Sequence, residues 1–251
     1  MTTAGEAQRL AYLRALGIDV WVLRDGAAAG ADEPAAEAAA LAAAASSARG
    51  AVPAEAPPAA ADPAGDGWEA LRARVVGCTR CGLHEGRTQT VFGVGNPDAR
   101  LMLIGEAPGA EEDRRGEPFV GRAGKLLDEM LRSLGLSRED VFIANILKCR
   151  PPGNRDPRPE ESAECRPYLR RQIALVGPRV ILAVGRVAAQ DLLESNEPIG
   201  RLRTRVHRYP EADIPVVVSY HPAYLLRSPG QKRKAWQDLR RARDLLAGSG
   251  P

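Results

Sequence analysis

The chain has 251 residues, a formal net charge of +3 and only 4% aromatic residues, and its mean hydropathy is −0.27 although 44% of its residues are apolar. Alanine explains that contrast, because it counts as apolar but buries little surface. No stretch approaches the roughly 18 consecutive apolar residues that a membrane span needs, which excludes a transmembrane protein. The N-terminus lacks the basic-then-apolar order of a secretory signal, so we expect a cytoplasmic protein with no membrane partner.

The first 66 residues differ from the rest in charge and composition. They carry four arginines and nine acidic residues, net −5, whereas residues 67–251 carry 31 basic and 23 acidic residues, net +8. Residues 1–25 predict a small tethered element, and docking of this element on the main domain or on an unknown protein partner is the alternative. Residues 26–66 contain 21 alanines in 41 positions and predict a disordered Ala/Pro-rich linker. The basic balance of residues 67–251 is compatible with a polyanionic partner, and equally with a composition bias toward arginine.

From residue 67 onward, short apolar runs alternate with amphipathic stretches. The runs that predict buried strands are Leu101–Gly105, Val141–Ile146, Val180–Val184 and Val216–Ser219. The stretches that predict helices are Ala123–Leu134, Pro159–Val176, Val187–Leu193 and Gln231–Leu246. This alternation predicts a three-layer α/β/α domain around a central, mostly parallel sheet of four strands, whose ligands bind beyond the carboxyl ends of the strands.

Four cysteines form two pairs, a C-x2-C pair at Cys78 and Cys81 and a C-x15-C pair at Cys149 and Cys165. A C-x2-C pair brings two thiolates within reach of one centre, and the loop between the second pair can close back on the first. The pattern predicts one site that uses all four thiolates rather than four unligated thiols. Zinc and an iron–sulfur cluster both accept four thiolates, so the spacing leaves both open.

Two motifs follow predicted strands. GEAPGAEED, at residues 105–113, is not a phosphate-binding P-loop, because no Gly-Lys-Ser/Thr follows and its carboxylates would repel phosphate. Carboxylates at a strand end are suited to a cationic transition state or to orienting water.

HPAYLLRSP, at residues 221–229, places two leucines and an arginine a few residues after a histidine. An isolated histidine there is typical of a capped core residue, but an exposed apolar tip beside basic residues favours insertion into duplex DNA.

Residues from about 70 to 247 resemble the family 4 uracil-DNA glycosylases, the iron–sulfur-containing branch. The matching motifs are C-x2-C at 78–81, GEAPG-x-x-E-D at 105–113, EPFVGRAGKLL at 117–127, N-x3-C-R-P-P-x-N at 145–154, Cys165, and HPAYLLR at 221–227. The resemblance implies a monomeric uracil-DNA glycosylase of the same α/β fold, acting on single- or double-stranded uracil-containing DNA. It also implies a [4Fe–4S] cluster held by the four cysteines, and it does not extend to residues 1–66.

The resemblance implies a role for each motif residue. The residues implied to act in catalysis are Glu106, Asn154 and His221. Glu106 and Asn154 would position water and stabilise positive charge, and His221 would donate to uracil O2. The residues implied to bind uracil are Gly105, Glu106, Ala107, Glu112, Phe119, Asn145 and His221. Those implied to contact DNA are Leu225, Arg227, Lys232, Arg233 and Lys234. Phe119 would stack on the flipped base, although ordinary core packing is the alternative, and Asn145 would read the Watson–Crick edge.

Departures from related branches sharpen the expected activity. Family 1 enzymes carry an aspartate that handles the water where this chain has Ala107, so Glu106, with Asn154, is the candidate for positioning the water here. No lysine sits at a motif position to form a Schiff base, which predicts a glycosylase without strand cleavage. The interval from Arg150 to Glu164 contains no histidine, which argues against self-crosslinking to DNA. The alternatives are a non-catalytic nucleic-acid-binding module of the same fold and a zinc-stabilised nucleotide hydrolase.

Overall fold

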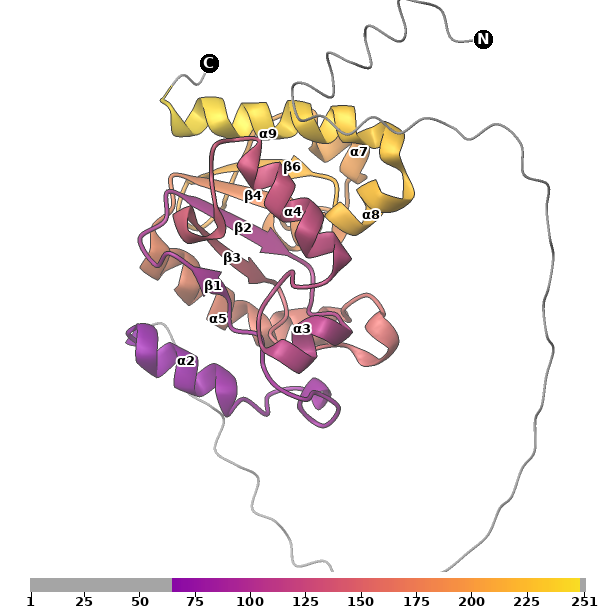
Figure 1. Cartoon of the computed structure of the whole chain (residues 1–251). Coiled ribbons are helices and arrows are strands. Elements are labelled where there is room, and N and C mark those ends of the chain that lie inside the picture. Colours follow the sequence, from indigo (N-terminus) through magenta and orange to yellow (C-terminus); the bar gives the residue numbers. More distant parts are fainter. Residues whose placement is uncertain (1–64, 249–251) are drawn as a thin grey trace, which may run out of the picture. The chain divides into compact units, whose positions relative to one another are not determined.

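The computed structural model describes residues 65–248 (Figure 1). The predicted element at residues 1–25, and all but the last two residues of the predicted linker at 26–66, lie outside this range. Within it, no helix is both long enough and apolar enough to cross a membrane.

The centre of the structure is a six-stranded sheet with the order β1-β3-β2-β4-β6-β5. Its four inner strands are β2 (Leu101–Gly105), β3 (Val141–Asn145), β4 (Val180–Val184) and β6 (Pro215–Ser219). All three pairings among them are parallel, and Gly105 at the end of β2 pairs with Asn145 at the end of β3. The carboxyl ends of the strands therefore meet at one edge, as the apolar runs predicted.

The prediction of a four-stranded sheet was wrong, because a short antiparallel strand adds to each side. β1 (Val94–Gly95) pairs with β3, and β5 (His207–Arg208) pairs with β6. Each has two residues and no apolar run, so nothing in its local sequence marks it as a strand. The pairing depends on the neighbouring strand edge, which only the folded chain supplies.

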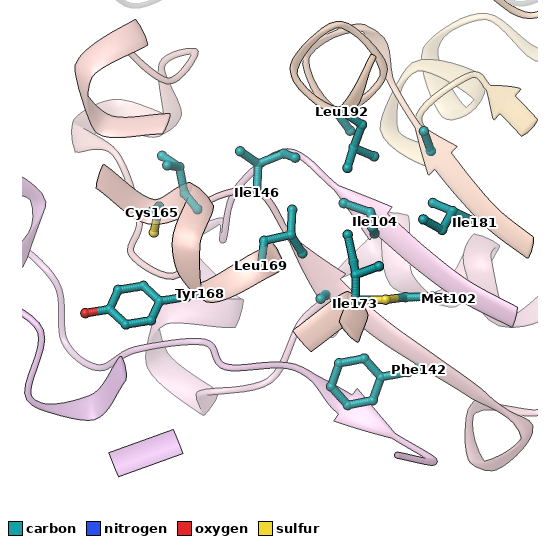
Figure 2. Close-up of a cluster of buried hydrophobic side chains, with 14 of the residues drawn as sticks. Met102, Ile104, Phe142, Ile146, Cys165, Tyr168, Leu169, Ile173, Ile181 and Leu192 are labelled. Atoms are coloured by element: carbon teal, nitrogen blue, oxygen red, sulfur yellow. The ribbon is translucent and has the colours of Figure 1, made fainter. Parts of the chain in front are cut away.

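Helices cover both faces of the sheet (Figure 1). One face packs against α2 (Trp68–Val76), α5 (Pro159–Val176), α6 (Arg186–Leu192) and α7 (Ile199–Leu202). Its core includes Met102, Phe142, Ile173 and Ile181, and it extends to Cys165 (Figure 2). The other face packs against α4 (Arg122–Arg132), α8 (Pro222–Arg227) and α9 (Lys232–Leu246). These two cores confirm the three-layer prediction. The four expected helices, α4, α5, α6 and α9, end within about two residues of their predicted bounds, whereas α2, α7 and α8 were not predicted.

Short elements complete the carboxyl edge of the sheet and the loops around it. They are α3 (Ala110–Arg115) and the 3-10 turns η2 (Gly82–His84), η3 (Arg138–Asp140), η4 (Pro152–Asn154) and η5 (Pro229–Gln231).

Candidate active site and cysteine cavity

An open cavity of about 480 Å³ lies at the carboxyl edge of the sheet. Its lining comprises Glu106, Ala107, Gly109, Glu112, Phe119, Ala123, Asn145, Asn154, Asp156, His221, Ala223, Tyr224 and Arg227. The structure thus brings together most of the residues that the motifs singled out, from four separate segments of the chain.

The end of β2 and the end of β3 form the floor of this cavity. The Asn145 side chain is 2% exposed, and its Oδ1 has no hydrogen-bond partner within residues 65–248. A Cβ atom on Gly105 would lie 2.5 Å from that Oδ1 and 2.6 Å from the Phe119 ring. Gly105 is therefore needed because two functional side chains pack directly over its backbone, rather than because it lines the cavity itself.

Phe119 lies in a loop with an unusual backbone conformation. Its φ of 55° is in the left-handed region, which is unfavourable for an aromatic residue. Its carbonyl group also approaches α4 so closely that a Cβ atom on Gly124 would lie 1.6 Å from the Phe119 oxygen. The ring itself stacks on the His221 imidazole, with centroids 5.5 Å apart and planes 28° from parallel. A strained residue with a buried ring at the cavity indicates a loop shaped for function.

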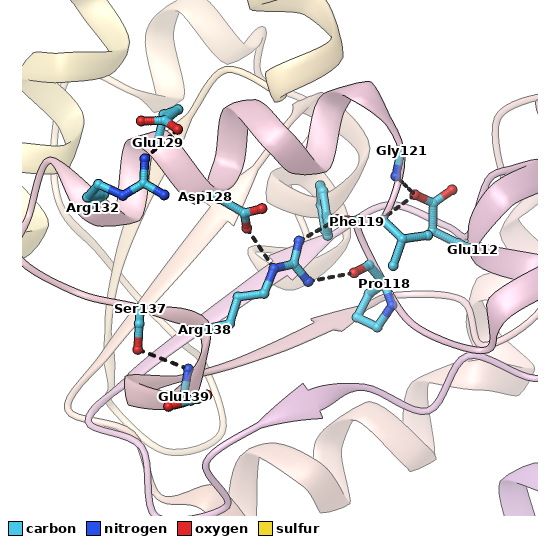
Figure 3. Close-up of polar contacts among 11 residues, drawn as sticks. Glu112, Pro118, Phe119, Gly121, Asp128, Glu129, Arg132, Ser137, Arg138 and Glu139 are labelled. Carbon is cyan, nitrogen blue, oxygen red and sulfur yellow. Dashed lines mark hydrogen bonds and ion pairs between the residues drawn. The ribbon is translucent and has the colours of Figure 1, made fainter. Parts of the chain in front are cut away.

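Two charged side chains hold the Phe119 loop from opposite sides (Figure 3). Arg138 donates to the carbonyl oxygens of Pro118, at 3.1 Å, and of Phe119, while its Nε donates to Asp128 at 2.6 Å. The Glu112 carboxylate accepts from the backbone N–H groups of residues 120 and 121, at 2.9 and 3.1 Å, and from Gly109. Glu112 lines the cavity as predicted, but both of its oxygens serve to fasten loops together.

His221 caps the start of α8. Its Nδ1 accepts the backbone N–H of Ala223 at 3.1 Å, so in the neutral ring the proton is on Nε2. Burial, and secondarily the positive charge of Arg227, lower the pKa of His221 to about 4. The ring is therefore neutral at physiological pH and keeps one N–H to donate.

Glu106 follows β2 directly and is partly buried in the cavity. Burial, and secondarily the negative charge of Asp156, raise its pKa to about 7, while Arg186 opposes this increase. Asp156 is itself paired with Arg186. The carboxyl group can thus change its protonation state near neutral pH, which is a property of many acid–base and water-orienting groups.

Asn154 lies at the end of η4 and also lines the cavity. Its Oδ1 accepts from Arg150 Nε at 2.7 Å, which fixes the side-chain amide. The structure therefore places Glu106 and Asn154 at one cavity, as the motifs predicted, with the Asn154 NH2 group as the part of that amide left for a ligand.

The prediction that Leu225 forms an exposed apolar tip was wrong. Leu225 is 1% exposed and packs in the core beneath α8, whereas Leu226 is 37% exposed and Tyr224 is 36% exposed. On a helix the side chain that faces the core is fixed by the 3.6-residue period and by the packing partner, and a run of two leucines leaves both registers open. Arg227 and residues 232–234 are exposed, as predicted.

All four cysteines line a second, much smaller cavity of about 10 Å³, which is room for about one water molecule. Arg87 Nη1 donates to Cys149 Sγ at 3.1 Å, and the Lys148 backbone N–H donates to Cys165 Sγ at 3.3 Å. Burial raises the pKa of Cys149 and raises that of Cys165 to about 12, so neither is prepared to act as a nucleophile. Within residues 65–248, no three His, Cys, Asp or Glu side chains are arranged to hold a metal ion.

The motifs gave no role to three residues that lie at the cavity or act on it: Arg138, Asp156 and Tyr224. Arg138 acts on a loop 19 residues away, and Asp156 acts on a carboxylate 50 residues away, so no local spacing reports either contact. Tyr224 lies within the HPAYLLR motif. Its role was missed because the sequence pattern does not show whether Tyr224 or its neighbour Leu225 faces the cavity.

Several known proteins are similar to this chain. The model of the uracil DNA glycosylase superfamily matches residues 92–240, more than half of the chain. A type-4 uracil-DNA glycosylase of Archaeoglobus fulgidus is 44% identical over 183 residues, which cover 70% of this chain and 92% of that protein. Type-4 uracil-DNA glycosylases of Sulfurisphaera tokodaii and Thermotoga maritima are each 42% identical over 187 residues, covering 85% and 96% of those proteins.

Proposed function

The chain belongs to the type-4 branch of the uracil DNA glycosylase superfamily, and from that premise we propose how its cavity excises uracil from DNA. The reaction is hydrolysis of the bond between the base and its sugar, the first step of base excision repair. The observation that carries the assignment is the meeting, in one cavity, of an unpaired Asn145 amide oxygen, the Phe119 ring and a neutral His221.

Uracil would be recognised at the floor of the cavity after it leaves the base stack. Asn145 Oδ1, which has no partner among the described residues, would accept the uracil N3–H, while the amide NH2 would donate to O4. The Phe119 ring supplies an apolar surface for the base. Gly105 permits both contacts because any larger residue would displace the two side chains.

His221 would stabilise the departing base. Negative charge develops on uracil O2 as the glycosidic bond breaks, and a preorganised N–H donor at that point lowers the barrier. The bond from Ala223 to Nδ1 leaves the His221 proton on Nε2, and the low pKa keeps the ring neutral. A neutral donor stabilises the anion without transferring a proton to it.

Glu106 would act on the sugar side of the bond. The sugar becomes cation-like as uracil leaves, so a carboxylate at the strand end stabilises it and orients the attacking water. Asn154, held by Arg150, would bind the same water through its amide group. No lysine is among the cavity-lining residues within 65–248, which supports hydrolysis without a Schiff base and hence without strand cleavage.

DNA would lie across the cavity mouth and the start of α9. Arg227 borders the cavity, and Lys232, Arg233 and Lys234 are exposed on the first turn of α9. Leu225 is not part of this surface, because it is buried. Phosphate contacts of this kind make binding salt-dependent, so changing the three α9 residues to alanine is expected to flatten the slope of log K against log salt.

We propose that the group in the cysteine cavity is a [4Fe–4S] cluster rather than zinc, as the resemblance to the iron–sulfur-containing branch implies. All four thiols line one small cavity. Both a four-iron cluster and a zinc ion accept four thiolates, so the choice between them rests on the resemblance. The N–H groups that point at two sulfurs are the contacts that such clusters receive. Cys78, Cys81, Cys149 and Cys165 would hold it as a structural group.

The direct test is release of uracil from DNA. Purified protein is incubated with a uracil-containing oligonucleotide and with a matched thymine control, and abasic sites are then cleaved with alkali. We expect cleavage of the uracil strand alone and none before alkali. DNA binding without abasic sites would instead identify a non-catalytic module. Activity as a monomer in the cytoplasm, and a partner for residues 1–25, remain predictions.

The assignment of Asn145 has its own test. An Asn145→Asp variant presents an ionised carboxylate to uracil O4 and has no proton to offer there. Single-turnover excision should therefore slow, with an activation free energy higher by about 1–3 kcal/mol or more. The same variant can accept from cytosine N4 and is the one to examine for weak cytosine excision. A wild-type rate on uracil would show that Asn145 does not read the base.

A further inference from the structure

Tyr224 lies at the rim of the uracil cavity and has no role in the chemistry described above. It lines the same cavity as Phe119 and His221, yet its side chain is 36% exposed, so one part of it faces the cavity and another faces solvent. Exposed aromatic side chains beside basic residues are the surfaces on which nucleic-acid-binding proteins stack bases. Arg227, also on the cavity wall, supplies the neighbouring positive charge.

Contacts with Tyr220, and through it with a buried ion pair, support the Tyr224 ring. The Tyr224 ring packs on the Tyr220 ring, with centroids 5.1 Å apart and planes tilted by 42°. The Arg203 guanidinium lies 5.3 Å from the Tyr220 ring centroid, and two of its nitrogens donate to the fully buried Asp238 at 2.8 and 3.0 Å. A ring supported by a buried ion pair loses little freedom on binding, which favours its use as a stacking surface.

The other apolar side chains of α8 are less suited to this position. Leu225 is 1% exposed and belongs to the core, so it cannot reach a base without unfolding the helix. Leu226 is 37% exposed, but it is not among the residues that line the cavity. Tyr224 is thus the residue of α8 that combines an aromatic face, exposure and contact with the cavity.

We propose that Tyr224 forms a second nucleobase subsite, which takes the unpaired base next to uracil in the same DNA strand. This inference rests on the proposed function, because uracil must occupy the inner cavity for its neighbour to reach the rim. Stacking accepts any base, since every base has a π-face, so the subsite adds affinity without restricting the sequence around the uracil.

The test uses two single-stranded oligonucleotides, one with uracil between ordinary bases and one with uracil between abasic spacers. On the first, Tyr224→Ala should raise the half-saturating concentration in single-turnover excision by roughly 5–50-fold, the range for loss of one stacked base. On the spacer oligonucleotide, Tyr224→Ala and wild type should be equal. Tyr224→Phe should behave as wild type, because it keeps the aromatic ring.

Inhibition by free uracil separates this subsite from the inner cavity. Free uracil fills only the inner cavity, so its inhibition constant should be the same for wild type and Tyr224→Ala. An equal loss on both oligonucleotides, a changed inhibition constant, no loss at all, or a loss confined to duplex DNA would each overturn the proposal. Failure of the proposed function would look different, because wild type would then release no uracil from either oligonucleotide.

Discussion

The uracil cavity and the cysteine cavity are organised in different ways. Around the uracil cavity, the chain fixes its own functional groups: Glu112 and Arg138 fasten the Phe119 loop, and a backbone N–H fixes the His221 ring. Around the cysteine cavity, four thiols come from the loop after α2, the loop after β3 and α5. Arg87 and the Lys148 backbone N–H donate hydrogen bonds to two of the sulfurs, those of Cys149 and Cys165.

A bound group in the cysteine cavity alone, as proposed above, would account for this difference. The cavity at the carboxyl edge is held in shape by hydrogen bonds within the protein, whereas the cysteine segments would present ligands to the proposed cluster. The two regions meet in the loop after β3, where Lys148 Nζ donates to the backbone carbonyl oxygen of Asn145 at 2.8 Å and to Gln172 Oε1 at 2.6 Å. Loss of the group in the cysteine cavity should therefore disturb the uracil cavity through Asn145, while the reverse should not hold.

The largest expected effect is on the cysteine side. Cys149→Ala should lose iron and colour and much of its soluble yield, because the proposed cluster would join three segments and would contribute a large part of a stability of only about 5–15 kcal/mol. Iron per protein in the soluble fraction is the measurement. His84→Ala is the matched control, since His84 lines the same cavity but bonds to a backbone carbonyl, at Cys81. Full iron content in Cys149→Ala would remove Cys149 from the ligand set.

The next largest effect lies in the uracil cavity and should leave the fold intact. His221→Ala should slow excision about 10²–10³-fold, the loss typical of removing one donor to a developing oxyanion. DNA binding should change far less, because the bond strengthens only as charge develops, and iron content should be unchanged. A parallel loss of DNA binding would make His221 a recognition residue instead.

The sequence predicts the inner sheet well because burial leaves a local record. Leu101–Gly105 and Val180–Val184 are strands with the predicted bounds, since an apolar run between turn residues has few other uses. The helix at Pro159–Val176 also has its predicted bounds, because proline favours its first turn and Gly177 adopts the left-handed conformation that ends it. The motifs likewise predicted which residues meet at the carboxyl edge.

What the sequence could not predict depends on contacts between distant segments. The edge strands β1 and β5 exist only against their neighbours, and the choice between Leu225 and Leu226 as the buried side chain is made by packing on the sheet. The same holds for the pKa of Glu106, which follows from burial and from a carboxylate 50 residues away.

A smaller effect is expected where the chain fastens its own catalytic loop. Arg138→Leu should reduce kcat/KM by about 5–30-fold, because it removes charged hydrogen bonds that hold Phe119 in a left-handed conformation. Weaker inhibition by free uracil, with unchanged DNA binding, would locate the loss at the base. Arg132→Leu is the control, since Arg132 pairs with Glu129 on the exposed face of the same region and does not touch the loop (Figure 3).

The smallest expected effect is a shift of the pH profile. The raised pKa of Glu106 means that its carboxylate forms only as pH rises through about 7, so the excision rate should fall below that pH. Protonation of His221 does not interfere, because its pKa is about 4.

Asp156 adds to the raised pKa of Glu106, so Asp156→Asn should move the acid limb to lower pH by less than about one unit, with up to about tenfold more activity at pH 6. Arg186 lowers the pKa of Glu106, so Arg186→Gln should move the acid limb to higher pH, and Glu106→Gln should abolish the limb. The measurement is the single-turnover rate of each variant between pH 5 and 9. If Asp156→Asn leaves the limb at its wild-type pH, the titrating group is not Glu106.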